Sequence, residues 1–293
     1  MKVLNFGSLN IDYVYNLDHI VRPGETITSK SLTIFPGGKG LNQSVALARA
    51  GAKVYHAGLI GKDGCFLKEV CAESGVCVDY INQIDTRTGN AIIQVTDCGQ
   101  NSIVLYAGAN RKNTKVFVDE VLEDFEEKDT LLLQNEVNLI DYLIEAGSEK
   151  GMTIMLNPSP YDKLLEQCDL SKVDVFIMNE VEGEQISGEK ESEKILKFMR
   201  ETYPNSKVVL TLGERGSIYN DKNHTYIQEI VPVQAVDTTA AGDTFTGYYI
   251  AAVIEGKSEH EALELAAKAA AIAVSRKGAS GSIPVRSELD KLY

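Results

Sequence analysis

The chain has 293 residues, 44% of them hydrophobic, and a formal net charge of −13. This length and hydrophobic content can bury a large core in one main domain. The acidic balance repels a phosphate backbone and excludes nucleic acid as the expected partner. Because the sequence has neither a signal-peptide pattern nor an apolar run of membrane-spanning length, we expect a cytoplasmic protein with no membrane partner.

Motifs of several common enzyme classes are missing from the sequence. There is no G-x-x-x-x-G-K-[ST] loop, no G-x-G-x-x-G after a strand, no H-E-x-x-H and no G-x-S-x-G. These absences argue against P-loop phosphotransferases, dinucleotide oxidoreductases, zinc hydrolases and serine hydrolases. The five cysteines are odd in number and form no C-x-x-C pair, which predicts reduced thiols rather than disulfides or a zinc site.

The first expected element is a strand at Val3–Phe6, which leads into the polar segment Gly7–Asp12. Polar ligand groups belong at strand ends in an open α/β sheet, which makes Asn10 and Asp12 candidates. Taken singly, an Asn after a strand is more often a turn residue.

A glycine-rich segment, Pro36–Gln43, follows. Adjacent glycines bring the backbone close to a ligand, and Lys39 and Asn42 supply hydrogen-bonding groups for hydroxyls, which suits a polyhydroxy substrate. The same residues can also form a strand-to-helix turn, because Gly40–Ala50 predicts a helix that Gly51 ends. Both interpretations can hold together.

Strand and helix patterns alternate from about Leu131 onward. Strands are expected at Leu131–Gln134, Thr153–Leu156, Val173–Met178 and Lys207–Thr211, with helices between them. This alternation predicts a three-layer α/β/α fold with a mainly parallel sheet. Two segments, at about 13–35 and 89–106, alternate apolar and polar residues instead and predict antiparallel strands outside the main sheet.

Two further motifs follow expected strands. Asn179 and Glu182 come after Val173–Met178 in an N-x-x-E pattern, which is weak by itself. A Glu that acts through water is a reasonable partner for Mg²⁺. The segment Val209–Gly216 contains T-L-G-x-x-G, whose glycines fit either a ligand contact or a hairpin.

The most informative segment is Val236–Phe245, an acid-flanked run of small residues that leads into an apolar helix. Its small side chains leave the N–H groups of Ala241, Gly242 and Asp243 uncovered at a helix N-terminus, where a phosphate is favoured. A carboxylate beside that phosphate is placed to take a proton from an attacking hydroxyl, so phosphoryl transfer to an alcohol is indicated. The alternative is that Asp243 is an ordinary helix cap.

The last expected helix begins with a capping box at Ser258–Glu261, is rich in alanine and runs to Val274. A loop at Ser275–Ser282 ends it.

The segment Asp237–Phe245 matches the signature D-T-x-A-A-G-D-x-F, and Gly37–Gln43 resembles G-G-K-G-x-N-Q. On these motifs, and on the order of the others from Gly7 to about Pro284, the chain resembles the ribokinase-type, or pfkB, family of carbohydrate kinases. The resemblance implies one ribokinase-like domain over 1–293 in which the segments at about 13–35 and 89–106 form a β lid over the sugar. Paired lids would make a homodimer.

The resemblance also implies roles for individual residues. The implied sugar ligands are Asn10, Asp12, Gly38, Lys39, Asn42, Glu136 and Asp243. The implied ATP-binding residues are Asn179, Thr211, Gly213, Gly216, Gly242 and Ala267. Catalysis is assigned to Asp243 as the base, with the backbone of Ala240, Ala241 and Gly242 stabilising charge.

Two metal sites are implied in the same way. Mg²⁺ is expected near Glu182 and Asn179, partly through water. K⁺ is expected at Asp237, Thr239, Ala273, Arg276, Gly278 and Ser282, largely through backbone carbonyls. One departure lies on the adenine side, where Ala267 and Lys268 replace a larger polar residue. The lid also diverges, with Tyr13, Tyr15 and Tyr106 placed where sugar specificity can be set.

The resulting hypothesis is an enzyme that phosphorylates the primary hydroxyl of a small sugar with ATP, with ribose favoured. The alternatives within the fold are deoxyribose, fructose, tagatose, a sugar acid or a nucleoside. A rival of another class is a sugar-binding regulatory protein without catalysis, but such a protein has no need of a base at Asp243.

Overall fold

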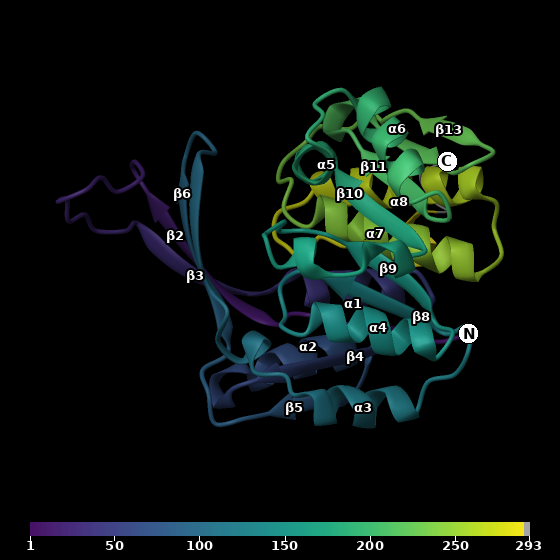
Figure 1. Cartoon of the computed structure of the whole chain (residues 1–293). Coiled ribbons are helices and arrows are strands. Elements are labelled where there is room, and N and C mark those ends of the chain that lie inside the picture. Colours follow the sequence, from purple (N-terminus) through teal and green to yellow (C-terminus); the bar gives the residue numbers. More distant parts are fainter. Residues whose placement is uncertain (290–293) are drawn as a thin grey trace.

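A large, mainly parallel sheet runs through the centre of the structure, a computed structural model that describes residues 1–289 (Figure 1). Within these residues the strand order is β13-β12-β11-β10-β9-β8-β1-β4-β5. The parallel strands are β1 (Val3–Phe6), β4 (Val54–Ile60), β5 (Cys77–Gln83), β8 (Thr130–Gln134), β9 (Thr153–Asn157), β10 (Val175–Asn179) and β11 (Lys207–Thr211). At one side of the sheet, β12 (Ser217–Asn220) pairs antiparallel with β11, and the edge strand β13 (Thr225–Gln228) pairs antiparallel with β12.

Helices cover both faces of this sheet. One buried cluster contains residues of α1 (Lys39–Arg49), α2 (Cys65–Glu73), α7 (Ala241–Ile254), α8 (Glu259–Val274) and α9 (Arg286–Leu289). The other contains residues of α3 (Lys115–Glu123), α4 (Ile140–Glu149) and α6 (Ser192–Thr202), and α5 (Glu180–Ser187) packs on α6. Short 3₁₀ turns lie at Lys62–Gly64, Gly108–Arg111, Leu165–Gln167, Leu170–Lys172 and Gly213–Arg215. The helices on both faces confirm the predicted three-layer α/β/α fold. The sequence could indicate this fold because strands buried on both faces are continuous apolar runs.

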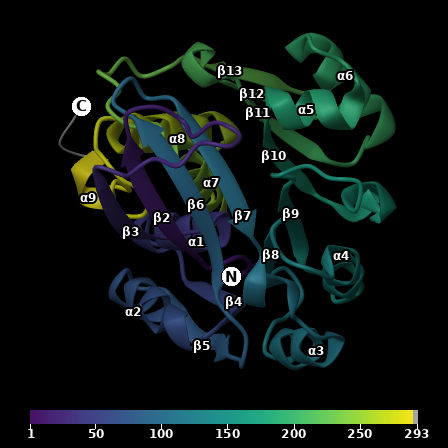
Figure 2. The ribbon, with the colours of Figure 1, turned by 90° about the vertical axis from the view of Figure 1, so that its left-hand side faces the viewer.

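A second sheet projects from the body (Figure 1) and lies in front of α1 and α7 in Figure 2. Its strand order is β3 (Ser31–Gly37), β2 (Asn10–Leu17), β6 (Gly89–Thr96) and β7 (Asn101–Tyr106). The outer pairs β2–β3 and β6–β7 are antiparallel, as expected. The central pair β2–β6, which joins the two segments, is parallel, so the expected antiparallel pairing holds within each segment but not between them. Both strands leave the body in the same direction, and a parallel pair follows when separate excursions of the chain meet in this way.

Two glycines allow the close approaches that bring distant segments to one place. A Cβ on Gly247 of α7 would lie 2.4 Å from the Cβ of Ala46 in α1. A Cβ on Gly40 would lie 2.3 Å from the backbone nitrogen of Ser8, in the β1–β2 connection. Since real Cβ contacts are not this short, only glycine lets α1 lie against both segments. The start of α7 is thereby held next to the first turn of α1.

Helix boundaries agree closely with the sequence analysis. The structure has the α8 capping box, in which the Ser258 hydroxyl accepts from the Glu261 N–H and the Glu261 carboxylate accepts from the Ser258 N–H.

Among residues 1–289, no helix combines the length and the apolar character needed to cross a membrane.

Candidate active site

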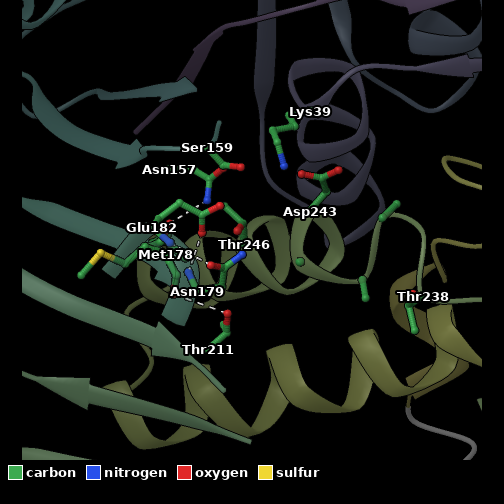
Figure 3. Close-up of a pocket in the computed structure, with 14 residues that line it drawn as sticks. Lys39, Asn157, Ser159, Met178, Asn179, Glu182, Thr211, Thr238, Asp243 and Thr246 are labelled. Carbon is green, nitrogen blue, oxygen red and sulfur yellow. Dashed lines mark hydrogen bonds between the residues drawn. The ribbon is translucent and has the colours of Figure 1, made fainter. Parts of the chain in front are cut away.

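A pocket of about 240 Å³ lies between the first turn of α1, the ends of β9 and β10 and the start of α7 (Figure 3). Every segment that lines it is a strand end, a helix start or the loop between them, where backbone and side-chain polar groups are free to face a ligand. The lining residues are Lys39, Asn157, Ser159, Ile177, Met178, Asn179, Glu182, Thr211, Thr238, Ala240, Ala241, Gly242, Asp243 and Thr246.

Asp243 lies at one end of this pocket, with the Lys39 side chain directed toward its carboxylate (Figure 3), and its side chain is held by α1. Its Oδ2 accepts a hydrogen bond of 3.0 Å from Asn42 Nδ2, and its Oδ1 accepts one of 2.9 Å from Gln43 Nε2. The N-cap of α7 is Ala240, so Asp243 stands inside the helix and its carboxylate does not cap it. The helix-cap interpretation is therefore excluded, and the carboxylate is oriented by residues 200 and 201 positions earlier in the chain.

The backbone at the start of α7 is shaped to receive an anion. Ala240 adopts a left-handed conformation with φ of 60°, which turns the chain into the helix. Within the described part of the chain, the N–H groups of Gly242 and Asp243 have no hydrogen-bond partner, so both remain available to a phosphate. The Ala241 N–H was also expected to be free, but it donates to the Thr238 carbonyl at 3.2 Å because the 238–241 turn closes on itself.

The site contains several carboxylates and the cation Lys39, whose pKa values depend on one another. Burial, with Glu136 and Asp243 nearby, raises the pKa of Asp12 from 3.8 to about 7. Burial also raises the pKa of Glu136, against the opposing effects of Lys39 and Ser8. Burial alone lowers the pKa of Lys39, but the charges of Asp243, Glu136 and Glu182 outweigh it and raise that pKa. The ammonium group is therefore kept charged in the middle of the site.

The expected sugar ligands converge at the base of the projecting sheet. Glu136 accepts from the Ser8 hydroxyl and, at 3.0 Å, from the Lys39 N–H, which anchors it at the positive N-terminus of α1. Gly38 is the N-cap of that helix, with φ of 93°. Asn10 Oδ1 accepts from Asn110 Nδ2 at 2.7 Å.

Among these residues, Asn42 has a buried polar atom that is left free for a bound molecule. Its Nδ2 is used by Asp243, whereas its Oδ1 is buried without a hydrogen-bond partner. An unpaired buried carbonyl oxygen is costly unless something else satisfies it. A hydroxyl group of a bound molecule would do so.

Asn179 and Glu182 lie at the other end of the pocket (Figure 3). They form the capping box of α5: Asn179 Oδ1 accepts from the N–H groups of Val181 and Glu182, and Glu182 Oε2 accepts from the Asn179 N–H at 2.9 Å. In the described residues no three acidic, histidine or cysteine side chains converge on one point that could hold a metal. A divalent cation here would depend on Glu182, water and the oxygens of its ligand.

The other expected nucleotide residues are only partly brought together. Thr211 lines the pocket, whereas Gly213, Gly216 and Ala267 do not. Gly213 and Gly216, with φ of 58° and 89°, form the turn between antiparallel β11 and β12. This is the hairpin that the sequence left open as an alternative.

The residues expected around K⁺ hydrogen-bond to one another or to residues close to them in the chain. Asp237 accepts from the Thr239 N–H and hydroxyl with Oδ1 and from the Gly278 N–H with Oδ2. The Ala273 carbonyl accepts from the Arg276 N–H, and the Ser282 hydroxyl donates to the Ala279 carbonyl. Asp237 therefore ties the loop after α8 to the segment that leads into α7.

A second pocket, of about 390 Å³, lies on the projecting sheet. Its lining includes the three tyrosines singled out from the sequence, Tyr13, Tyr15 and Tyr106, together with Arg87, Asn90 and Ile92.

Sequence reasoning missed several polar residues of the main site. Gln43 lay inside a recognised motif without a role, and Asn157, Ser159 and Thr246 lay outside every motif. The position of Asn157 at the end of a predicted strand was the one signal available for it. Its Oδ1 is buried without a partner, as for Asn42.

Comparison with known proteins decides the family. A model of the pfkB family of carbohydrate kinases matches residues 1–286. The chain belongs to this family. The pfkB kinase is 38% identical to the ribokinase of Haemophilus influenzae over 291 residues, which covers 96% of this chain and 95% of that protein.

Solved structures are similar to the pfkB kinase over its whole length. The ribokinase of Cryptococcus neoformans in complex with ADP has a TM-score of 0.87 and 35% identity, covering 100% of this chain and 99% of that one. The ribokinase of Arabidopsis thaliana complexed with ribose and ATP also has a TM-score of 0.87, with 30% identity and coverage of 99% and 98%.

Proposed function

We propose that this pfkB kinase is a ribokinase, which transfers the γ-phosphoryl group of ATP to the primary hydroxyl of D-ribose in the cytoplasm. The products are D-ribose 5-phosphate and ADP. The observation that carries the proposal is the position of Asp243, whose carboxylate is held by two amides beside the free N–H groups of Gly242 and Asp243. A proton acceptor and an anion site thus adjoin one pocket, as phosphoryl transfer to an alcohol requires.

In the proposed reaction, Asp243 takes the proton of the primary hydroxyl as that oxygen forms its bond to the γ-phosphorus. The bond between the γ-phosphorus and the bridging oxygen of ADP breaks, and ADP leaves. The N–H groups of Gly242 and Asp243 stabilise the charge on the phosphoryl oxygens, and the Lys39 ammonium, which lies at the Asp243 end of the pocket, does the same.

The sugar is bound by Asn10, Asp12, Gly38, Lys39, Asn42 and Glu136 in this proposal. The free Oδ1 of Asn42 accepts one hydroxyl, and the carboxylates of Asp12 and Glu136 accept others. Such a set favours a polyol over an apolar alcohol. Ribose is proposed because similar proteins are named ribokinases and the similar Arabidopsis thaliana structure is complexed with ribose and ATP.

Mg²⁺ and K⁺ complete the proposed site. Glu182 and the unpaired Oδ1 of Asn157 are the groups that would hold Mg²⁺ through water, since both face the nucleotide end. Bound Mg²⁺ supplies neutralisation of the nucleotide phosphates. Backbone carbonyls of the loop after α8, which Asp237 ties to the start of α7, would hold K⁺.

We further propose that the kinase is a homodimer through its projecting sheet, which acts as the lid. Seven large apolar side chains of this sheet are between 43% and 61% exposed. The strand register places five of them on one face, Leu32, Ile34, Ile92, Val104 and Tyr106, and the other two, Ile103 and Leu105, on the opposite face. A patch of this kind is typical of an interface. Light scattering should show a dimer that Val104→Glu converts to a monomer; a monomeric parent protein would contradict the proposal.

The experiment that tests the function is ADP release from Mg-ATP across a panel of ribose, deoxyribose, fructose, tagatose and nucleosides, with and without potassium. Ribose-dependent release that increases with potassium is the expected result. Preference for another alcohol would overturn the choice of ribose and leave the kinase mechanism intact. Binding of a sugar without any ADP release would show a regulatory protein instead.

A further inference from the structure

A row of fully buried polar side chains leads from Asp243 into the body of the protein. Gln43 donates to Asp243 Oδ1, and Gln134 Nε2 donates at 2.7 Å to Gln43 Oε1. Gln134 Nε2 also donates at 3.0 Å to Asn5 Oδ1. Gln43, Gln134 and Asn5 are all 0% exposed. The amino group of Gln134 therefore donates one hydrogen bond to each of two neighbours.

The row continues away from the site on the far side of Asn5. Asn5 Nδ2 donates to Ser44 Oγ at 2.8 Å, Ser44 pairs with His56 Nδ1 at 2.8 Å, and His56 Nε2 reaches the Gly7 carbonyl at 3.2 Å. A carbonyl only accepts, so His56 Nε2 carries its hydrogen. Burial lowers the pKa of His56 to about 4, so the ring is neutral and Nδ1 accepts from the Ser44 hydroxyl.

The direction of every bond in this row is set by its two ends. The Asp243 carboxylate and the Gly7 carbonyl both accept, so the intervening amides must donate toward them, and the two arms diverge at Gln134. If residue 134 could only accept, Gln43 would turn its amino group inward. Its carbonyl oxygen would then face the Asp243 carboxylate.

We propose that Gln43 and Gln134 are positioning residues of the phosphoryl-transfer step. Gln134 orients Gln43, and Gln43 holds Oδ1 of Asp243 so that the carboxylate faces the substrate hydroxyl. This inference rests on the proposed role of Asp243 as the base. Gln43 is 0% exposed and does not line the pocket, and Asn42, which is 6% exposed, holds the other oxygen of Asp243. Loss of the Gln43 bond therefore acts on kcat rather than on sugar binding.

The decisive variant is Gln134→Glu, which keeps the size of the side chain and removes both of its N–H donors. A hydrogen bond to a charged group contributes enough that we expect kcat to fall roughly 10- to 100-fold. The dissociation constant for the sugar should stay within about threefold of the parent value. The matched control is Ser44→Ala, on the arm that leads away from Asp243; it removes buried hydrogen bonds of the same row and should leave kcat within about threefold.

The inference is overturned if Gln134→Glu retains parental kcat, or if Ser44→Ala lowers kcat as much as Gln134→Glu does. Gln43→Met provides a second variant if Gln134→Glu fails to fold. We expect it to lower kcat as well, without weakening the binding of the sugar.

A readout that needs no turnover separates this inference from the proposed function. In an NMR spectrum of the intact protein with labelled glutamine, the side-chain amide signal of Gln43 should shift both in Asp243→Asn and in Gln134→Glu. An unchanged signal in Gln134→Glu would overturn the positioning role whatever the substrate is. If the parent protein phosphorylates another sugar, only the proposed substrate is wrong. The ratio of variant kcat to parent kcat is then measured with that sugar, and the positioning role is tested as before.

Discussion

At the sugar end of the pocket, Asp243 is held by Asn42 and Gln43, 201 and 200 residues earlier in the chain. At the nucleotide end, Asn179 and Glu182 bond to each other's backbone across three residues. The sugar end therefore exists only when α1 and α7 are packed together, whereas the nucleotide end forms with the first turn of α5. Changes to tertiary packing should accordingly disturb proton acceptance more than metal or nucleotide binding.

The largest expected effect is on Asp243 itself. Asp243→Asn removes the proton acceptor and should lower kcat by roughly 10² to 10⁴. Sugar affinity should change far less, because the remaining sugar ligands lie on α1, β2 and the β8–α4 connection. Steady-state ADP release and calorimetric sugar binding measure the two quantities. Near-parental turnover in folded Asp243→Asn would contradict the mechanism.

The pH dependence of stability tests the buried support of the sugar end. An unfolded histidine binds a proton below its ordinary pKa of 6.5, whereas folded His56 does so only near pH 4. The unfolded state thus holds more protons between these values, and His56 makes the free energy of unfolding rise by about 3 kcal/mol from pH 4 to 6.5. His56→Gln should remove this rise in urea unfolding measured across that range.

Asp12 provides the matched comparison, because its contribution has the opposite sign. Its folded pKa of about 7 exceeds the ordinary value of 3.8, so the folded state holds more protons between them and stability falls as pH increases. Asp12→Asn should therefore make the rise of stability with pH steeper. Equal slopes in both variants would show that neither group has the environment described.

The contact between α1 and α7 should respond to a single methyl group. Gly247→Ala places a Cβ where Ala46 already lies, and overpacking of this kind costs roughly 1–3 kcal/mol. We expect lower stability in urea unfolding together with a lower kcat, since Asp243 moves relative to Asn42. Adding Ala46→Gly should restore part of both losses. A normal kcat in a destabilised Gly247→Ala would show that the site does not depend on this contact.

The smallest expected effect lies at the nucleotide end. Glu182→Gln keeps a side chain that can complete the capping box but removes its charge. The Mg²⁺ concentration for half-maximal activity should rise roughly tenfold, as for residues that act on a metal through water. Thermal stability should hardly change. Glu261→Gln makes the same change in the α8 capping box and should leave the Mg²⁺ dependence unaltered; equal effects of the two would assign Glu182 a capping role alone.

Much of the fold was predictable because its signals are local. The strand at Val3–Phe6 and the strand at Lys207–Thr211 have the predicted bounds, and the Ser258 capping box begins α8. The pairing of β2 with β6 was not predictable in the same way, since their parallel direction depends on how two separate excursions of the chain meet. The Ala241 N–H was likewise misjudged, because its bond to Thr238 depends on the left-handed turn at Ala240.

The sequence by itself determined the alternation of strands and helices, the small residues at the start of α7 and the acid that follows them, because each depends on spacing along the chain. Tertiary structure alone decided what holds that acid. The amides that hold it, directly or through one another, come from three elements: Asn42 and Gln43 from α1, Gln134 from β8 and Asn5 from β1. They meet only after the sheet has formed and Gly247 has let α7 lie against α1. Hydrogen bonds of this kind leave no periodic trace, since their partners are related by packing and not by distance in sequence.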